Sequence, residues 1–99
     1  MTRVEFGQGT NADFDRILAH LAAFEAEHVE ERIGEIVEAC GLLARHPLIG
    51  RARPDQKREL VIGSGTKGYV ALYRFIEESG LVLILAIRAQ REKGFARGL

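Results

Sequence analysis

The stretch Gly68–Arg91 constrains the fold of this chain more than any other part of its sequence. Two apolar runs, Tyr69–Ile76 and Leu81–Ile87, flank the tetrapeptide Glu77-Glu78-Ser79-Gly80. Each run has the length of one strand, and a short connection that contains glycine is typical of a β-hairpin. Because the second run has almost no polar residue, it predicts a central strand that is covered on both faces. This run is too short to cross a bilayer, so no membrane partner is expected.

The first strand of this hairpin is expected to present two different faces, because side chains alternate across a strand. Tyr69, Ala71, Tyr73 and Phe75 share one face, and Val70, Leu72, Arg74 and Ile76 share the other. Arg88 and Arg91 close the second strand, so guanidinium groups lie on or beside a very apolar sheet. They form either a binding surface for an acidic partner or strand ends that are kept soluble, and the residues alone leave both readings open.

Length and cysteine usage predict a single domain, residues 1–99, in a reducing compartment. A chain of 99 residues can bury a core that is adequate for independent folding. The first residues contain no apolar run, so no signal peptide is expected. Cys40 is the only cysteine, which excludes an internal disulfide and favours the cytoplasm.

The zero net charge of the chain hides two halves of opposite charge. Residues 1–44 carry three basic and nine acidic residues, a net charge of −6. Residues 45–99 carry eleven basic and five acidic residues, a net charge of +6. Such asymmetry favours an acidic partner for the second half, and it is also compatible with self-association.

Before the hairpin, the sequence predicts a short strand and a first amphipathic helix. Thr2–Phe6 alternates weakly and is the candidate first strand, which Gly7-Gln8-Gly9 ends. Thr10 then offers a side-chain oxygen to the free amides of a helix start, and with Asp13 it resembles a capping box. The apolar positions that follow have helical spacing: Phe14, Ile17, Leu18, Leu21 and Phe24.

A second amphipathic helix follows, although Glu25-Ala26-Glu27-His28 contains no strong breaker that would fix its start. Its apolar stripe consists of Val29, Ile33, Ile36, Val37, Cys40 and Leu43. Pro47 and Gly50 end this helix, because proline cannot continue it and restricts the residue before it. Two helices with a short join predict a helical hairpin that packs on one face of a sheet.

The remaining segments complete an α+β fold with the order β-α-α-β-β-β. A polar, basic loop over residues 51–56 precedes a strand over Lys57–Ile62. Gly63–Gly68 is predicted to be a turn, because it precedes a strand and lacks the residue order of a phosphate-binding loop. Glu92–Leu99 is predicted to be a mobile basic tail that forms one loose helical turn. The expected architecture is an N-terminal strand and an α-helical hairpin on a mainly antiparallel β-sheet.

No residue pattern predicts a metal site, a cofactor or a catalytic group. The three histidines, His20, His28 and His46, are far apart in the sequence, and the first two are expected on helix surfaces. Cys40 belongs to a helix stripe and is predicted to be a core residue, since free cysteine behaves as a small hydrophobe. A nucleophilic pair of cysteine and histidine stays possible but has no support in the sequence.

Four segments, taken in order, resemble the RelE/ParE superfamily of bacterial toxins. They are RHPLIGR at residues 45–51, REL at 58–60, GYVALYR at 68–74 and ILAIRAQR at 84–91. The resemblance covers essentially the whole chain. It implies a toxin of a type II toxin–antitoxin module that a co-expressed antitoxin neutralises.

Two different activities occur in this superfamily, and the resemblance implies the ParE-like one. RelE-like members are ribosome-dependent messenger RNases that use lysine, arginine and a C-terminal tyrosine, whereas ParE-like members poison DNA gyrase and are not nucleases. The matching positions hold Glu59, Val70 and Phe95. None of these supplies the expected charge or proton transfer. We therefore expect a gyrase inhibitor rather than an enzyme, with a RelE-like messenger RNase as the alternative.

The resemblance also implies two contact surfaces on this chain. A ParD-like antitoxin with an acidic, amphipathic segment is expected to contact the sheet half through Arg58, Tyr73, Arg74 and Arg88. The alternative is that these arginines pair with Glu59 and Glu77 within the sheet. The candidates for contact with gyrase are Arg91, Lys93, Phe95 and Arg97 in the basic tail, which is otherwise a solvated end. Truncation after Arg91 is expected to leave the core intact. A toxin–antitoxin hetero-oligomer is expected, without direct DNA binding by the toxin alone.

Overall fold

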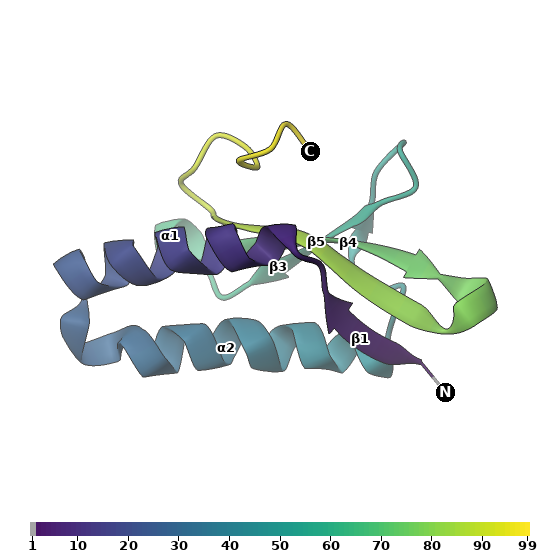
Figure 1. Ribbon diagram of the computed structural model, residues 1–99, viewed down its shortest axis with the longest axis horizontal. Coiled ribbons are helices and arrows are strands. Elements are labelled where there is room, and N and C mark those ends of the chain that lie inside the picture. The colour runs from purple at the N-terminus through teal and green to yellow at the C-terminus, as the bar shows by residue number, and fades with distance from the viewer. Residues whose placement is uncertain (1) are drawn as a thin grey trace.

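Two helices pack against one face of a five-stranded sheet (Figure 1). The computed structural model describes residues 2–99. The strands are β1 (Arg3–Phe6), β2 (Arg51–Ala52), β3 (Arg58–Ile62), β4 (Tyr69–Ile76) and β5 (Leu81–Ala89). The helices are α1 (Gly9–Phe24) and α2 (Val29–Gly41), with short 3₁₀ helices at Ala26–His28, Leu42–Ala44, Gly65–Lys67 and Glu77–Ser79. The predicted α+β fold, with its N-terminal strand and helical hairpin, is confirmed.

The predicted hairpin of β4 and β5 forms the centre of the sheet, whose strand order is β1-β5-β4-β3-β2. Strand β1 is parallel to β5, and the other neighbours are antiparallel. Gly80 closes the hairpin turn with a φ of 62°, a backbone conformation that glycine adopts without steric cost. The pairing shifts between Leu72–Ala86 and Tyr73–Ile84, so Leu85 is an extra residue that forms a β-bulge in β5.

The hydrophobic core lies between the helices and the sheet face that carries Tyr69, Ala71 and Tyr73. These side chains pack with Ile17 and Leu21 of α1 and with apolar residues of α2. The predicted division of β4 into two faces is therefore confirmed.

Cys40 belongs to this core, as predicted, with none of its surface exposed. Burial raises the pKa of its thiol to about 12. The thiol therefore stays protonated near neutral pH and is not an activated nucleophile.

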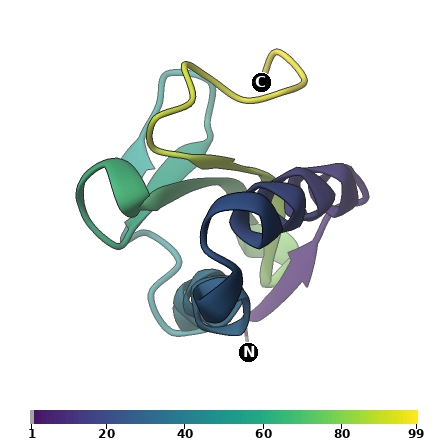
Figure 2. The same cartoon turned by 90° about the vertical axis from the view of Figure 1, so that its left-hand side faces the viewer.

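Two expectations about apolar surfaces are wrong. Strand β5 is central, but Leu83 and Leu85 stay partly exposed, because residues 2–99 form no second layer of helices over their face of the sheet. Figure 2 shows both helices on the same side. Phe24 belongs to the apolar stripe of α1, yet it is 75% exposed. It lies in the last turn of α1, where the helical hairpin extends past the end of the sheet (Figure 1).

The structure also corrects several local predictions. Helix α1 begins at Gly9, and the Thr10 hydroxyl donates to the Gly7 carbonyl (2.7 Å) instead of capping the helix. Residues 51–52, predicted as loop, form the edge strand β2, and β3 begins one residue later than expected. The described tail, residues 90–99, contains no helical turn.

Candidate functional site

The sheet face turned away from the helices, termed the outer face, carries two of the four residues predicted to contact the antitoxin, Arg74 and Arg88. Strand pairing places Val61, Val70 and Arg88 side by side on it, and likewise Glu59 with Leu72. Arg74 pairs with Leu83 on the same face. The outer face therefore combines the exposed guanidinium group of Arg74 and the partly buried one of Arg88 with apolar side chains, as the sequence predicts.

The three positions that distinguish a nuclease from a gyrase inhibitor lie on or beside the outer face, and none holds a proton-transfer group that is free to act. Glu59 is bound by two arginines, with Arg51 Nη2 at 3.2 Å and Arg53 Nη1 at 3.5 Å from its oxygens. Val70 is 2% exposed. Phe95 lies under the guanidinium of Arg88, whose central carbon is 5.1 Å from the ring centroid. This arrangement is a cation–π contact.

Arg88 organises the start of the tail. Its Nη1 donates to the carbonyl oxygens of Ala89 (3.1 Å), Gln90 (3.3 Å) and Glu92 (3.0 Å). Its Nε is buried and has no hydrogen-bond partner among the described residues. The charge of Arg88 is thus used to turn the chain from β5 into the tail.

Arg58 and Tyr73 hold the loop Pro47–Gly50, which joins the helices to the sheet. Arg58 Nη1 donates to the carbonyl oxygens of Leu48 (3.1 Å) and Gly50 (2.8 Å). The buried Tyr73 hydroxyl donates to the Pro47 carbonyl (2.8 Å) and accepts from the Gly50 amide (2.9 Å). A side chain at Gly50 would come within 2.6 Å of the Tyr73 ring, so only glycine fits there. Both residues, predicted as antitoxin contacts, serve the internal structure.

Arg74 differs from the other arginines of the predicted antitoxin site. It is exposed and has no ion pair with any described residue. It borders a shallow depression of about 220 Å³ together with Gln56, Ile76 and Glu77. The alternative prediction, pairing of these arginines with Glu59 and Glu77, is not found, because Glu59 pairs with Arg51 and Arg53 instead.

Four charged side chains cover the edge of β5 beyond the end of β1, and together they are termed the edge cluster. Pairing of β1 with β5 ends at Phe6–Ile84, just before the bulge at Leu85. Asp13 then accepts from the Ile87 amide (3.0 Å), Arg16 donates to the Ile87 carbonyl (3.0 Å), Glu92 accepts from the Ala89 amide (3.0 Å) and Arg97 donates to the Leu85 carbonyl. These side chains take the place of a neighbouring strand and satisfy the backbone hydrogen bonds at this edge of β5.

Asp13 is the centre of the edge cluster and is fully buried. Besides the Ile87 amide, it accepts from Arg16 (3.0 Å) and Arg97 (3.1 and 3.2 Å). Burial alone would raise the pKa of Asp13, but the hydrogen bonds from Arg97, the Ile87 amide and Arg16 outweigh it and hold this pKa below its ordinary value. The sequence pattern predicts Asp13 only as part of a helix start. The missed signal was its helical spacing with Ile17 and Leu21, which places a carboxylate on the buried stripe.

The basic tail is docked, which corrects the prediction that it is mobile and dispensable. Arg97 ties the tail to Asp13 and to the Gly9 carbonyl (2.7 Å). Glu92 ties it to Arg16, whose Nε lies 3.2 Å from Glu92 Oε2. Truncation after Arg91 would remove both contacts and would therefore disturb the start of α1.

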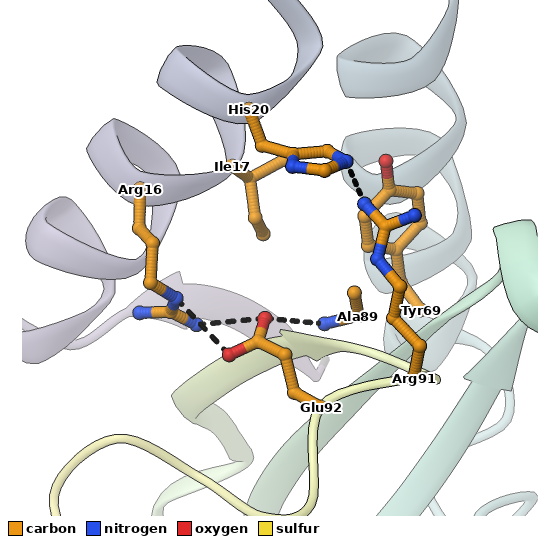
Figure 3. A pocket seen from close by; sticks show the side chains of 7 residues that line it. All are labelled: Arg16, Ile17, His20, Tyr69, Ala89, Arg91 and Glu92. Carbon is orange, nitrogen blue, oxygen red and sulfur yellow. Dashed lines mark hydrogen bonds and ion pairs between the residues drawn. The ribbon is translucent and has the colours of Figure 1, made fainter. Parts of the chain in front are cut away.

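A pocket of about 230 Å³ opens between α1, the ends of β4 and β5, and the start of the tail (Figure 3). It is lined by Arg16, Ile17, His20, Tyr69, Ala89, Arg91 and Glu92. Arg91 Nη2 contacts His20 Nε2 across the opening. His20, expected on a helix surface, is partly buried and forms one wall of this pocket.

The four residues predicted to contact gyrase separate into two pairs. Arg97 and Phe95 are committed to Asp13 and Arg88. Arg91 and Lys93 are exposed, and within the described chain Lys93 has no ion pair. Two of the four predicted tail residues are therefore available for contact with a partner, fewer than the sequence indicated.

The described residues hold no group of three or more histidine, cysteine or acidic side chains that could bind a metal ion. The helices of the described chain are all too short or too polar to cross a membrane.

Comparison with known proteins places this architecture in a family. A family model described as "ParE toxin of type II toxin-antitoxin system, parDE" matches residues 4–94. The chain is also similar to "Toxin RelE3" of Caulobacter vibrioides (strain ATCC 19089 / CIP 103742 / CB 15). The two are 29% identical over 93 residues, which cover 94% of this chain and 99% of the relative.

Proposed function

This chain belongs to the ParE toxin family of type II toxin–antitoxin systems, and we propose that it acts by binding DNA gyrase rather than by cleaving messenger RNA. Membership of this family implies that the toxin has a cognate antitoxin. The family resemblance suggests that this antitoxin is ParD-like. The proposal places toxin and antitoxin together in the cytoplasm as a hetero-oligomer.

The outer face carries this proposal, because the described positions that match RelE-like catalytic residues hold no free general acid or base. Cleavage next to a ribose 2′-hydroxyl needs proton transfer, which contributes about 10²–10⁴ in rate. At the matching positions, Glu59 is bound by Arg51 and Arg53, and Phe95 has no exchangeable proton. Val70 adds no charge to stabilise a phosphorane. A surface without these groups supports inhibition by protein contact.

For gyrase, we propose contact through the exposed cations of the docked tail. Arg91 and Lys93 project from a segment whose backbone Arg88 and Arg97 hold in place. A held segment loses less conformational entropy on binding than a mobile one, which favours a defined contact.

For the antitoxin, we propose contact through Arg74 and the exposed apolar side chains of the sheet half. Val61 is 54% exposed on the outer face, and Leu48 and Ile49 are 59% and 63% exposed in the neighbouring loop. Arg74 has no internal partner among the described residues, so it can pair with an acidic residue without breaking an existing ion pair. Apolar and cationic groups together suit an acidic, amphipathic segment.

A charge reversal at Arg74 tests this antitoxin surface. Arg74→Glu should weaken antitoxin binding by about 1 kcal/mol or more, measured by calorimetry, because a like charge would replace an attractive one. Lys67→Glu is the matched control. Lys67 is also an exposed cation, but it lies just before the first residue of β4, away from Arg74. Equal affinity of both variants and the unchanged chain would remove Arg74 from the proposed contact.

The experiment that decides between the two function classes measures both activities with one preparation. Purified protein should inhibit supercoiling by gyrase and accumulate cleaved DNA, while ribosome-bound messenger RNA stays intact. Phe95→Tyr with Glu59→Lys supplies two of the groups that a RelE-like enzyme uses, and it is the natural comparison variant. Codon-specific cleavage of ribosome-bound message by the unchanged chain, with gyrase unaffected, would establish the RelE-like alternative instead.

A further inference from the structure

The pocket in Figure 3 has an apolar interior and a rim of charged groups. The side chain of Ile17 and that of Ala89, which are 4% and 8% exposed, lie between the two sides of its rim. Its volume of about 230 Å³ is below the roughly 300–1,000 Å³ of small-molecule sites. The pocket therefore has room for one large side chain rather than for a cofactor.

The charges on the rim do not cancel. Glu92 is neutralised, since it accepts from the Ala89 amide (3.0 Å) and pairs with Arg16 (3.2 Å). On the neighbouring helix α2, Arg32 pairs with Glu25 at 3.6 Å. Arg91, in contrast, contacts only the imidazole of His20 and has no carboxylate partner among the described residues. The rim thus offers one guanidinium group whose charge is unpaired.

Tyr69 adds a second donor on the same side of the pocket. Its hydroxyl forms no hydrogen bond with a described side chain, and Figure 3 shows its ring behind the guanidinium of Arg91. Burial raises the pKa of Tyr69, so the hydroxyl keeps its proton and can donate. An arginine and a phenol beside an apolar interior suit a carboxylate that stands next to an apolar side chain.

We propose that this pocket is an anchor site for an acidic polypeptide segment, which places a large apolar side chain inside the pocket and an adjacent carboxylate on Arg91 and Tyr69. The partner is the acidic segment that neutralises the toxin, so this inference rests on the proposed function. Occupation would cover Arg91 at the start of the tail. The antitoxin would then mask part of the surface that we propose for gyrase.

Peptide probes test the anchor site directly on the full chain. The first probe is a blocked peptide with four glutamates around one phenylalanine. In the second, glutamines replace the glutamates, and in the third, alanine replaces the phenylalanine. Binding is followed by NMR through the amide shifts of Ile17, Ala89 and Glu92. The acidic phenylalanine peptide should bind at least about tenfold more tightly than either comparison peptide, since charge-assisted hydrogen bonds and apolar burial both contribute.

Matched variants locate the contact. Arg91→Gln should remove the preference for glutamate, whereas Lys93→Gln, the same charge change two residues along the exposed tail, should keep it. Tyr69→Phe retains the ring and should lower the preference severalfold. Shifts that lie away from the pocket, or a preference that survives Arg91→Gln, would overturn the anchor site. Because these readouts are binding alone, a gyrase assay on the same preparations reports separately whether the proposed function fails.

Discussion

The loop Pro47–Gly50 and the tail after β5 are both irregular segments held by arginines, but they are held by different chemistry. Arg58 and the Tyr73 hydroxyl fix the loop through backbone groups alone. Arg88 also binds backbone carbonyls, but the end of the tail depends on Asp13, a buried carboxylate. The loop leaves apolar side chains exposed and the tail leaves cations exposed. Some arginines of this chain therefore stabilise the fold, and others stay available to bind a partner. Only their contacts in the structure distinguish these two roles.

Of the substitutions proposed here, removal of the Asp13 carboxylate should cause the largest loss of stability, because it releases the tail from its anchor. Asp13→Ala should lower the free energy of unfolding by about 3 kcal/mol, because it leaves two arginines and the Ile87 amide without their shared acceptor. Urea unfolding followed by circular dichroism measures this. Hydrogen exchange should accelerate in the tail while the loop stays protected. Exchange that rises equally in both segments would mean that the two are not separately held.

Removing the hydroxyl of Tyr73 is the corresponding test for the loop. Tyr73→Phe should cost about 2 kcal/mol, since the buried Gly50 amide loses its acceptor. Exchange should then accelerate at Gly50 and not in the tail. A variant as stable as the unchanged chain would show that water replaces the hydroxyl and that the loop has another anchor.

The end of the tail should respond less strongly to loss of its own arginine. Arg97→Gln is expected to cost about 1 kcal/mol, because Asp13 retains Arg16 and the Ile87 amide and the Arg97 side chain is 34% exposed. Lys93→Gln serves as the control and should change stability by less than about 0.5 kcal/mol. If the two substitutions have the same effect, Arg97 is not an anchor.

Lowering the pH should weaken the anchoring of the tail but not that of the loop, because only the tail depends on the ionised carboxylate of Asp13. A carboxyl whose pKa is lower in the folded state contributes stability above its unfolded pKa, and this is lost as the pH falls through the folded value. The stability difference between the unchanged chain and Asp13→Asn should therefore shrink below about pH 4. Burial raises the pKa of Tyr73, so the contribution of the loop should fall only as the pH rises beyond about 10. A difference that stays constant into acid would show that Asp13 is not ionised in the folded chain.

The sequence was sufficient to predict the fold, because hydrophobic periodicity and turn residues report directly on strands and helices. The β4–β5 hairpin, the two helices and the buried Cys40 all follow from such local patterns. The roles of the charged residues do not. Asp13 and Arg97 lie 84 positions apart, and no local pattern indicates that they meet.

The candidate site was predictable only in part for the same reason. The outer face and its guanidinium groups follow from strand alternation, and Arg74 is exposed there. The use of Arg58 for the loop depends on where the loop crosses the sheet edge, which no strand pattern contains. The pocket at Arg91 and His20 likewise needs α1 and the tail to lie together.

The proposed action of this toxin by contact with gyrase can be examined by titrating gyrase with the purified chain. Gyrase is held at a concentration well above the expected dissociation constant, and supercoiling is measured as the protein is added. Inhibition by contact should increase linearly and stop at a fixed molar ratio of chain to gyrase, with no cleavage of ribosome-bound message. Arg91→Gln with Lys93→Gln should shift or abolish that endpoint. If each chain cuts many messages and has no saturable effect on gyrase, the chain is a messenger RNase and not a gyrase inhibitor.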